Sequence, residues 1–169
     1  MDYKLVIAAC AVGLILTQVF IHEYKRDPNE YTELNFVFVK KEAVINGEYI
    51  IQFENPVKTK ERVFSYNNEF YTILEHNDDT VLLAKYPKTI EKNQEFSFSF
   101  EITNRLGEIW TYTYFISVNE EVVKENTIAV SNKEKKLIKE ELRIPSMGTA
   151  KLSVRLSTGE EIYFYVEVE

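Results

Sequence analysis

The sequence predicts an all-β fold, an antiparallel β-sandwich that follows a single N-terminal transmembrane helix. Three observations support this prediction. A stretch without any charge runs from Leu5 to Ile21, alternation of apolar and polar residues dominates the chain after it, and clusters of Asn, Gly, Pro and Asp interrupt that alternation at short intervals. Short strands separated by frequent turns are typical of a sandwich.

The size and composition of the chain indicate one soluble domain. Of the 169 residues, those left after the helix suffice for a domain of ordinary size with one core. Hydrophobic residues make up 45% of the chain and aromatic residues 14%, so there is enough apolar material to bury and intrinsic disorder is excluded. The net charge of −7 would repel a phosphate backbone, and nucleic acid is therefore not expected as a partner.

The hydrophobic stretch at the N-terminus has the properties of a membrane anchor. As a helix, residues 5–21 span about 26 Å, which is enough to cross a bilayer. Tyr3 and Tyr24 lie just outside the stretch, where interfacial aromatic residues are common. A cleaved secretory signal is the alternative, but the stretch ends in Phe20 and Ile21 instead of the small residues that cleavage requires.

We therefore expect a single-pass signal-anchor helix over residues 1–24, a juxtamembrane linker over residues 25–33 and the β-sandwich over residues 34–169. The domain is expected on the extracytoplasmic side of the cell membrane, because a short N-terminus before a lone anchor usually stays inside and long domains are translocated largely regardless of charge. The single cysteine, Cys10, lies within the anchor, so the stability of the domain has to come from its core.

Two hairpins are expected in the second half of the chain. The clearest strand covers residues 96–102, where four large apolar side chains alternate with polar ones. The next alternating run covers residues 109–118, and the glycine between the two runs suits a hairpin turn. We therefore expect these two runs to pair with each other. A second hairpin is expected between residues 151–157 and residues 162–168, which a Thr-Gly turn separates.

Further strands are expected earlier in the chain, at residues 34–40, 49–54, 70–76 and 80–84.

Residues 133–143 are ambiguous. The segment from Ser131 to Glu134 has the pattern of a helix capping box, and the leucines and isoleucine that follow have helical spacing. In favour of a strand, every second residue up to Pro145 lies on one face, and three of these four residues are apolar: Ile138, Glu140, Leu142 and Ile144. We favour the strand.

The order of features between Phe70 and Tyr114 resembles that of a known family. The run Phe70-Tyr71-Thr72-Ile73-Leu74 is followed by Tyr86-Pro87-Lys88-Thr89-Ile90, then by residues 96–104 and by Tyr112-Thr113-Tyr114. This order is similar to that of the extracytoplasmic domain of an archaeal membrane-protein family of unknown function, the one numbered sixteen-sixteen among such families. The resemblance implies an immunoglobulin-like, adhesion-type sandwich outside the cytoplasm, and it implies no catalytic residue.

Few residues of the domain have the properties of a catalytic or metal site. Activation of a nucleophile needs a positioned base, and His76 is the only histidine beyond the anchor. We expect no enzyme activity and no cofactor. The loop that begins at His76 is most simply a hairpin turn. Its alternative is a divalent cation site formed by Glu75, Asp78 and Asp79, whose oxygen atoms are ligands that calcium prefers.

Aromatic residues give the remaining signals. Phe96, Phe98, Phe100 and Trp110 are predicted to be core residues. Tyr163 and Tyr165 lie on the face of the last strand opposite its apolar residues, and exposed tyrosines are efficient contact residues at interfaces. A second packed layer that covers them is the alternative.

Together these features favour a non-catalytic module of the cell envelope. Its expected partners are the membrane, through residues Leu5–Ile21, and a protein of the envelope or of a membrane complex. The alternative function is that of a carbohydrate- or calcium-binding surface module.

Overall fold

The computed structural model describes residues 30–77 and 79–169, and its regular structure there consists of strands. The predicted anchor at residues 5–21 lies outside the described residues. Within the described ranges, no helix is long and apolar enough to cross a membrane. Residues Thr32–Glu169 form one compact unit. The prediction of an all-β domain is confirmed.

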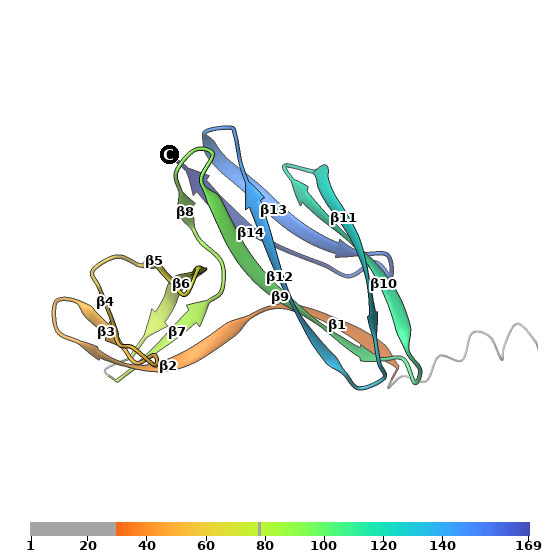
Figure 1. Cartoon of the computed structure of the whole chain (residues 1–169), viewed down its shortest axis with the longest axis horizontal. Coiled ribbons are helices and arrows are strands. Elements are labelled where there is room, and N and C mark those ends of the chain that lie inside the picture. The colour runs from red at the N-terminus through yellow and green to blue at the C-terminus, as the bar shows by residue number, and fades with distance from the viewer. Residues whose placement is uncertain (1–29, 78) are drawn as a thin grey trace, which may run out of the picture. The chain divides into compact units, whose positions relative to one another are not determined.

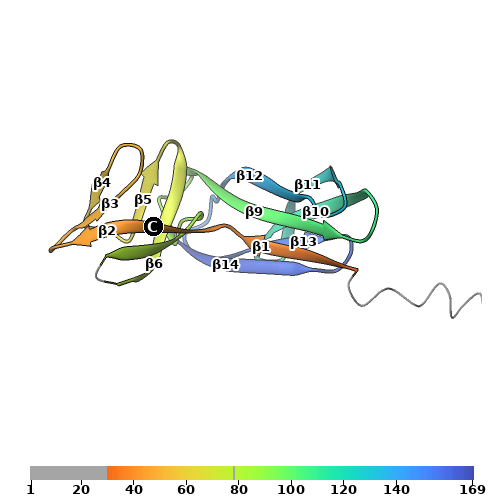
Figure 2. The ribbon, with the colours of Figure 1, turned by 90° about the horizontal axis from the view of Figure 1, so that it is seen from below.

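Two sheets pack face to face as the predicted sandwich, and β9 and β14 lie in different layers (Figures 1 and 2). The smaller sheet has the order β1-β9-β12, with β1 at Tyr31–Phe36, β9 at Glu95–Arg105 and β12 at Lys135–Arg143. The larger sheet has the order β11-β10-β13-β14-β8, with β8 at Thr89–Ile90, β10 at Trp110–Val118, β11 at Glu121–Val130, β13 at Gly148–Leu156 and β14 at Glu161–Val168. Strand β8 runs parallel to β14.

The strand order of this sandwich is immunoglobulin-like. If β1, β9 and β12 are strands A, B and E, then β11, β10, β13 and β14 are C′, C, F and G. The same division between the two layers is found in immunoglobulin-like domains, where A, B and E share one sheet and C, F and G the other.

A third sheet is inserted between β1 and β8. It has six strands in the order β4-β3-β2-β7-β6-β5: β2 (Phe38–Ile45), β3 (Tyr49–Ile51), β4 (Val57–Thr59), β5 (Val63–Tyr66), β6 (Glu69–His76) and β7 (Thr80–Ala84). The ring of Phe53, which follows β3, lies 6.3 Å from that of Phe64 and 4.4 Å from that of Tyr66, both in β5. The sheet therefore curls, so that the two ends of its strand order approach each other. We call it the inserted sheet.

A three-way backbone contact joins the inserted sheet to the sandwich. The amide of Val37, between β1 and β2, donates to the carbonyl of Ser99 at 3.2 Å. The amide of Lys85, just after β7, donates to the carbonyl of Val37 at 3.0 Å, and the amide of Ser99 donates to the carbonyl of Lys85 at 2.9 Å. At this point the chain stops pairing with β9, as β1, and starts pairing with β7, as β2.

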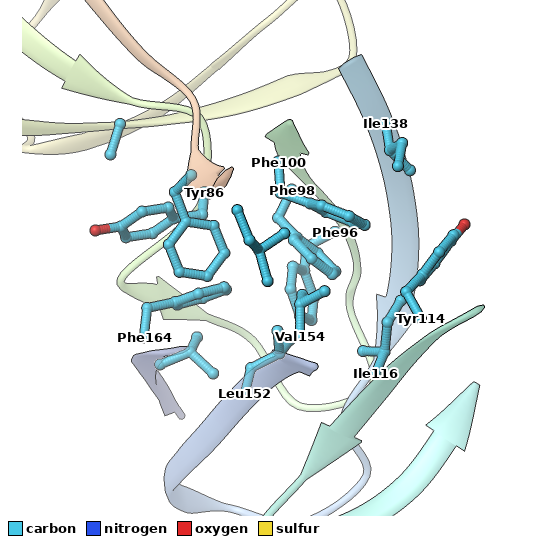
Figure 3. Close-up of a cluster of buried hydrophobic side chains, with 14 of the residues drawn as sticks. Tyr86, Phe96, Phe98, Phe100, Tyr114, Ile116, Ile138, Leu152, Val154 and Phe164 are labelled. Atoms are coloured by element: carbon cyan, nitrogen blue, oxygen red, sulfur yellow. The ribbon is translucent and has the colours of Figure 1, made fainter. Parts of the chain in front are cut away.

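The sandwich core is rich in aromatic residues. Phe96, Phe98 and Phe100 of β9 are buried, as predicted, and Figure 3 shows them between the two layers. The ring of Phe98 lies 5.9 Å from that of Phe164 in the opposite sheet. Trp110 is only half-buried and packs at the edge of this core.

The predicted pairing of residues 96–102 with residues 109–118 is wrong. Strand β9 pairs with β12, whereas β10 pairs with β11 and β13. Both runs carry large apolar residues on one face, and these faces pack against each other across the sandwich instead of lying side by side. The side chain of Asn104 stabilises the connection by which the chain passes from β9 in one sheet to β10 in the other. Its Nδ2 donates to the carbonyls of Glu108 at 2.8 Å and Val130 at 2.7 Å.

The other two expectations for the second half of the chain are confirmed. Strands β13 and β14 form the predicted hairpin. Residues 135–143 form a strand, as favoured. The capping-box contact exists nevertheless, since the Ser131 amide donates to the Glu134 carboxylate at 2.8 Å, but it closes a turn in which Lys133 has a φ of 64°. A left-handed residue at this place prevents the turn from continuing as a helix.

Candidate functional site

The two tyrosines of β14 project from the outer face of the larger sheet. Residues alternate along this strand, so Phe164 and Val166 are buried in the core while Tyr163 and Tyr165 are 54% and 55% exposed. The two tyrosine rings contact each other edge to face at 5.8 Å. Within the described part of the chain no second layer covers them.

Side chains of β13 and β14 surround these tyrosines. Ser153 lies directly opposite Tyr163, and Lys151 lies opposite Tyr165. The Nζ atom of Lys151 is 4.5 Å from the centre of the Tyr163 ring and 3.7 Å from a carboxylate oxygen of Glu161. A cation above an aromatic face is attracted to it, and the contact limits the rotation of Tyr163. We call these five residues the tyrosine face.

A depression of about 380 Å³ lies beside the tyrosine face. Tyr86 and Phe164, whose rings stack at 4.3 Å, belong to the buried core and line the depression together with the exposed rings of Tyr163 and Tyr165. The full lining is Tyr86, Lys88, Thr149, Tyr163, Phe164, Tyr165 and Glu167. We call it the edge pocket, because it lies at the edge of β14.

A second depression, of about 310 Å³, lies on the other side of Tyr163. Its charged lining residues balance, since Lys151 and Arg155 are cations while Glu120 and Glu161 are anions. The hydroxyl-bearing residues Ser117 and Ser153 also line it, together with Val122. It therefore favours neither a free anion nor a free cation.

A buried polar cluster is centred on Glu140 of β12 and was not predicted from the sequence. The Glu140 carboxylate, which is 6% exposed, accepts hydrogen bonds from the Tyr114 hydroxyl, from the Lys124 ammonium and, at 3.2 Å, from Asn126 Nδ2. Burial, together with the hydrogen bond to Glu140 and the charge of that carboxylate, raises the pKa of Tyr114. The phenol therefore stays protonated and donates, which ties β10 and β11 to β12.

The signal for this cluster was present in the sequence. Glu140 was placed on the same face as Ile138 and Leu142, and a carboxylate on an apolar face needs a partner. Its partners come from two other strands, and the sequence could not show that those strands would lie next to it.

The loop proposed as a cation site forms a turn of the β6–β7 hairpin. The amide of Asn77 donates to the carbonyl of Thr80 at 2.8 Å. Glu75 and Asp79 are exposed, and Asp78 lies outside the described residues. Residues 30–77 and 79–169 hold no group of three His, Cys, Asp or Glu residues that could bind a metal ion. The cation site remains a prediction.

No protein-family model and no curated protein matches this chain in sequence. Among solved structures, it is similar to the CARDB domain of a Pyrococcus furiosus protein in complex with di-metal ions, with 16% identity over 50% of this chain and 83% of that one and a TM-score of 0.46. It is also similar to a β-glucosidase from Listeria innocua, with 16% identity over 49% of this chain and 15% of that one and a TM-score of 0.44.

A third similar structure is the Pseudomonas fluorescens alkylpurine DNA glycosylase AlkC bound to DNA containing an abasic site analogue, with 15% identity over 49% of this chain and 28% of that one and a TM-score of 0.44. At TM-scores below 0.5 these likenesses carry no inference about what this chain binds.

Proposed function

We propose that this protein is a non-catalytic interaction module that binds a protein partner through the tyrosine face. The observation that carries the proposal is the exposure of Tyr163 and Tyr165 on neighbouring outward positions of one strand. Tyrosine offers a large apolar surface with few rotatable bonds and a hydroxyl that bonds water or a partner equally well. Such residues are enriched where protein surfaces meet.

The local structure supports a preorganised contact surface. Both tyrosines extend from a strand that is hydrogen-bonded to β13 over its whole length, and Lys151 restrains the ring of Tyr163. Less side-chain entropy is therefore lost on binding than for freely rotating residues.

The second part of the proposal concerns location. We infer that residues 5–21 anchor the domain in the cell membrane, with the sandwich on the extracytoplasmic side, as in the archaeal family that the sequence resembles. A tether restricts the domain to the vicinity of membrane or envelope partners. A moderate affinity of the tyrosine face is then sufficient, because the local concentration of such partners is high.

Site-specific photo-crosslinking in intact membranes tests the proposal. A photoreactive phenylalanine analogue replaces Tyr163 or Tyr165 in the full-length chain. The matched control carries the same analogue at Leu137, which is 55% exposed on β12 of the other sheet. We expect one discrete cross-linked protein from positions 163 and 165 and none from position 137. Equal products from all three positions, or no product at all, would contradict the proposal.

A glycan is the second candidate ligand, and the depression lined by Lys151, Arg155, Glu120 and Glu161 favours it. Sugar hydroxyls donate and accept hydrogen bonds, so a neutral sugar suits a lining whose charges balance. Calorimetry with neutral oligosaccharides tests this candidate. Heat that is lost in the Arg155→Ala variant would support it, and the absence of heat with the unaltered protein would eliminate it.

A further inference from the structure

One edge of β14 is open over most of its length. On one side, β13 pairs with β14 from Glu161 to Val168. On the other side, within the part of the chain that the structure describes, β8 pairs with it only at Glu167 and Val168. The segment from Glu161 to Tyr165 therefore has a strand partner on one side only.

The backbone of both exposed tyrosines points to this open edge. The amide of Glu167 donates to the carbonyl of Lys88 at 2.8 Å, and the amide of Glu169 donates to the carbonyl of Ile90 at 3.0 Å, both on the β8 side. Successive residues of a strand point their N–H and C=O groups to alternate sides. The N–H and C=O groups of Tyr163 and Tyr165 therefore face the open edge, while those of Phe164 face β13.

The chain before β8 does not fill this edge. Thr72 donates its hydroxyl to the carbonyl of Tyr86 at 2.6 Å, which holds the chain toward β6. Pro87, the next residue, has no N–H to donate to a neighbouring strand. The edge pocket occupies the space beside β14 instead, and four of its lining residues are aromatic: Tyr86, Tyr163, Phe164 and Tyr165.

We propose that an extended segment of a protein partner adds a strand to β14 at this edge. This inference rests on the proposed function and specifies how the partner binds. In such strand addition, main-chain hydrogen bonds provide affinity and pockets for alternate side chains provide specificity. Here the N–H and C=O groups of Tyr163 and Tyr165 form the main-chain bonds, and the edge pocket receives an apolar side chain.

The pocket decides between a partner segment and a second copy of this chain. An occupant has to offer an apolar side chain to the aromatic lining of the edge pocket and a second set of side chains to the outer face of the exposed tyrosines. The open edge of a second copy cannot do so, because the inward side chains of its own β14, Phe164 and Val166, are buried in its core. A segment whose side chains are free on both faces meets both requirements.

Two substitutions of Tyr163 separate the contribution of its backbone amide to the affinity from the contribution of its side chain. Tyr163→Thr removes the ring but keeps the amide, and threonine suits a strand. Tyr163→Pro removes the ring and the amide. Proline is tolerated on an edge strand when the missing N–H faces away from the ladder, so the β13–β14 pairing is retained.

The probe is a phage-displayed library of random ten-residue peptides, selected on the full-length chain in detergent micelles. We expect selected peptides with alternating apolar residues. Their affinity should fall by a few-fold at most for Tyr163→Thr and by at least a further tenfold for Tyr163→Pro. A library that gives no binding peptide counts against strand addition.

Amide hydrogen exchange of the unaltered protein gives a test that does not depend on the folding of a variant. The amides of Tyr163 and Tyr165 should exchange rapidly in the free protein and slowly with a selected peptide, whereas the amide of Phe164 should be slow in both states. Unchanged exchange, together with equal losses for the two variants, would overturn strand addition but leave face-to-face binding, and with it the proposed function, intact.

Two further outcomes are also decisive. If neither variant alters the affinity of any selected peptide, the tyrosine face is not the binding surface, and both proposals fail. If the chain forms a dimer that Tyr163→Pro abolishes, the edge belongs to a second copy, and the partner segment is overturned.

Discussion

The sandwich and the inserted sheet are built from similar short strands, but they bury their side chains in different ways. In the sandwich, apolar faces from two layers meet, and the rings of β9 pack on residues of the opposite sheet. The inserted sheet has to curl upon itself to form a core. That core is small and consists of Ala43, Ile51, Tyr71, Ile73, Val81 and Leu83, with partly buried aromatic rings around it.

This difference indicates how stability is distributed. Two facing layers exclude water from both sides of a core, whereas a single curled layer leaves its rim accessible. Regions with fewer buried apolar contacts open at lower free energy than the rest of a domain. We therefore expect the inserted sheet to open before the sandwich, and four predictions test this comparison.

The largest effect is expected for Phe98→Ala in the sandwich core. Phe98 is 1% exposed, and removal of its ring should lower the free energy of unfolding by about 3–5 kcal/mol. Denaturant unfolding measures this loss. Phe38→Ala in the inserted sheet is the matched control, because Phe38 is 50% exposed and its loss should cost about 0.5 kcal/mol or less. Similar losses for both variants would show that the Phe98 side chain is not packed in a core.

The second effect concerns Leu83→Ala in the core of the inserted sheet. Leu83 is fully buried, so the substitution should cost about 2–4 kcal/mol of local stability. Amide exchange should accelerate in β2, β6 and β7 and stay unchanged in β13 and β14. Equal acceleration in both regions would mean that the two sheets unfold as one unit.

The strands and the buried faces of these two regions could be predicted from the sequence more readily than the pairing of their strands. Alternation correctly predicted the sandwich strands β9, β10, β12, β13 and β14. It also identified the buried face of β14, because alternation determines which face of a strand is buried. It does not determine which strand is the neighbour, and for this reason β10 was paired with β9 instead of β11. Strand β11 was not predicted, because most of its residues are exposed. The short strands β4, β5 and β8, of three, four and two residues, were not predicted either.

The polar side of β9 illustrates the same limit. Ser97 and Ser99 alternate with the phenylalanines, as on a strand with one polar face, yet both are buried. The Ser97 hydroxyl donates to the carbonyl of Asn68, in the turn between β5 and β6, at 3.2 Å. The inserted sheet therefore covers this face, and no local pattern in the sequence could indicate a contact between residues so far apart in the chain.

The third prediction addresses the buried cluster of the sandwich. Glu140→Ala would leave Tyr114, Lys124 and Asn126 without their common acceptor, at a cost of about 1–3 kcal/mol. The neighbouring Glu141→Ala is the control, since that side chain is 58% exposed and its ion pair should contribute little. Denaturant unfolding compares the two variants. A loss for Glu140→Ala no larger than that for the control would show that the cluster does not hold β11 in place.

The smallest effect is expected in the inserted sheet, at Glu69. The Tyr71 hydroxyl and the Lys85 ammonium donate to the Glu69 carboxylate at 2.7 and 2.9 Å. Burial opposes ionisation of Glu69, but the two hydrogen bonds and the charge of Lys85 outweigh it and lower its pKa below the ordinary value of 4.5. Because the folded state holds the proton less tightly than the unfolded state, ionised Glu69 stabilises the fold above that ordinary value, and this stabilisation is lost as the pH falls through the lowered pKa.

Glu69 is partly exposed, so its contribution should be about 0.5 kcal/mol or less. Unfolding of the protein and of its Glu69→Gln variant, measured from neutral pH to about pH 3, should show a stability difference that is constant above the ordinary pKa and shrinks below it. Tyr71→Phe removes one of the two donors and should weaken this pH dependence without abolishing it, because Lys85 remains. A difference that instead grows as the pH falls would mean that burial dominates at Glu69 and raises its pKa, so that ionised Glu69 destabilises the inserted sheet.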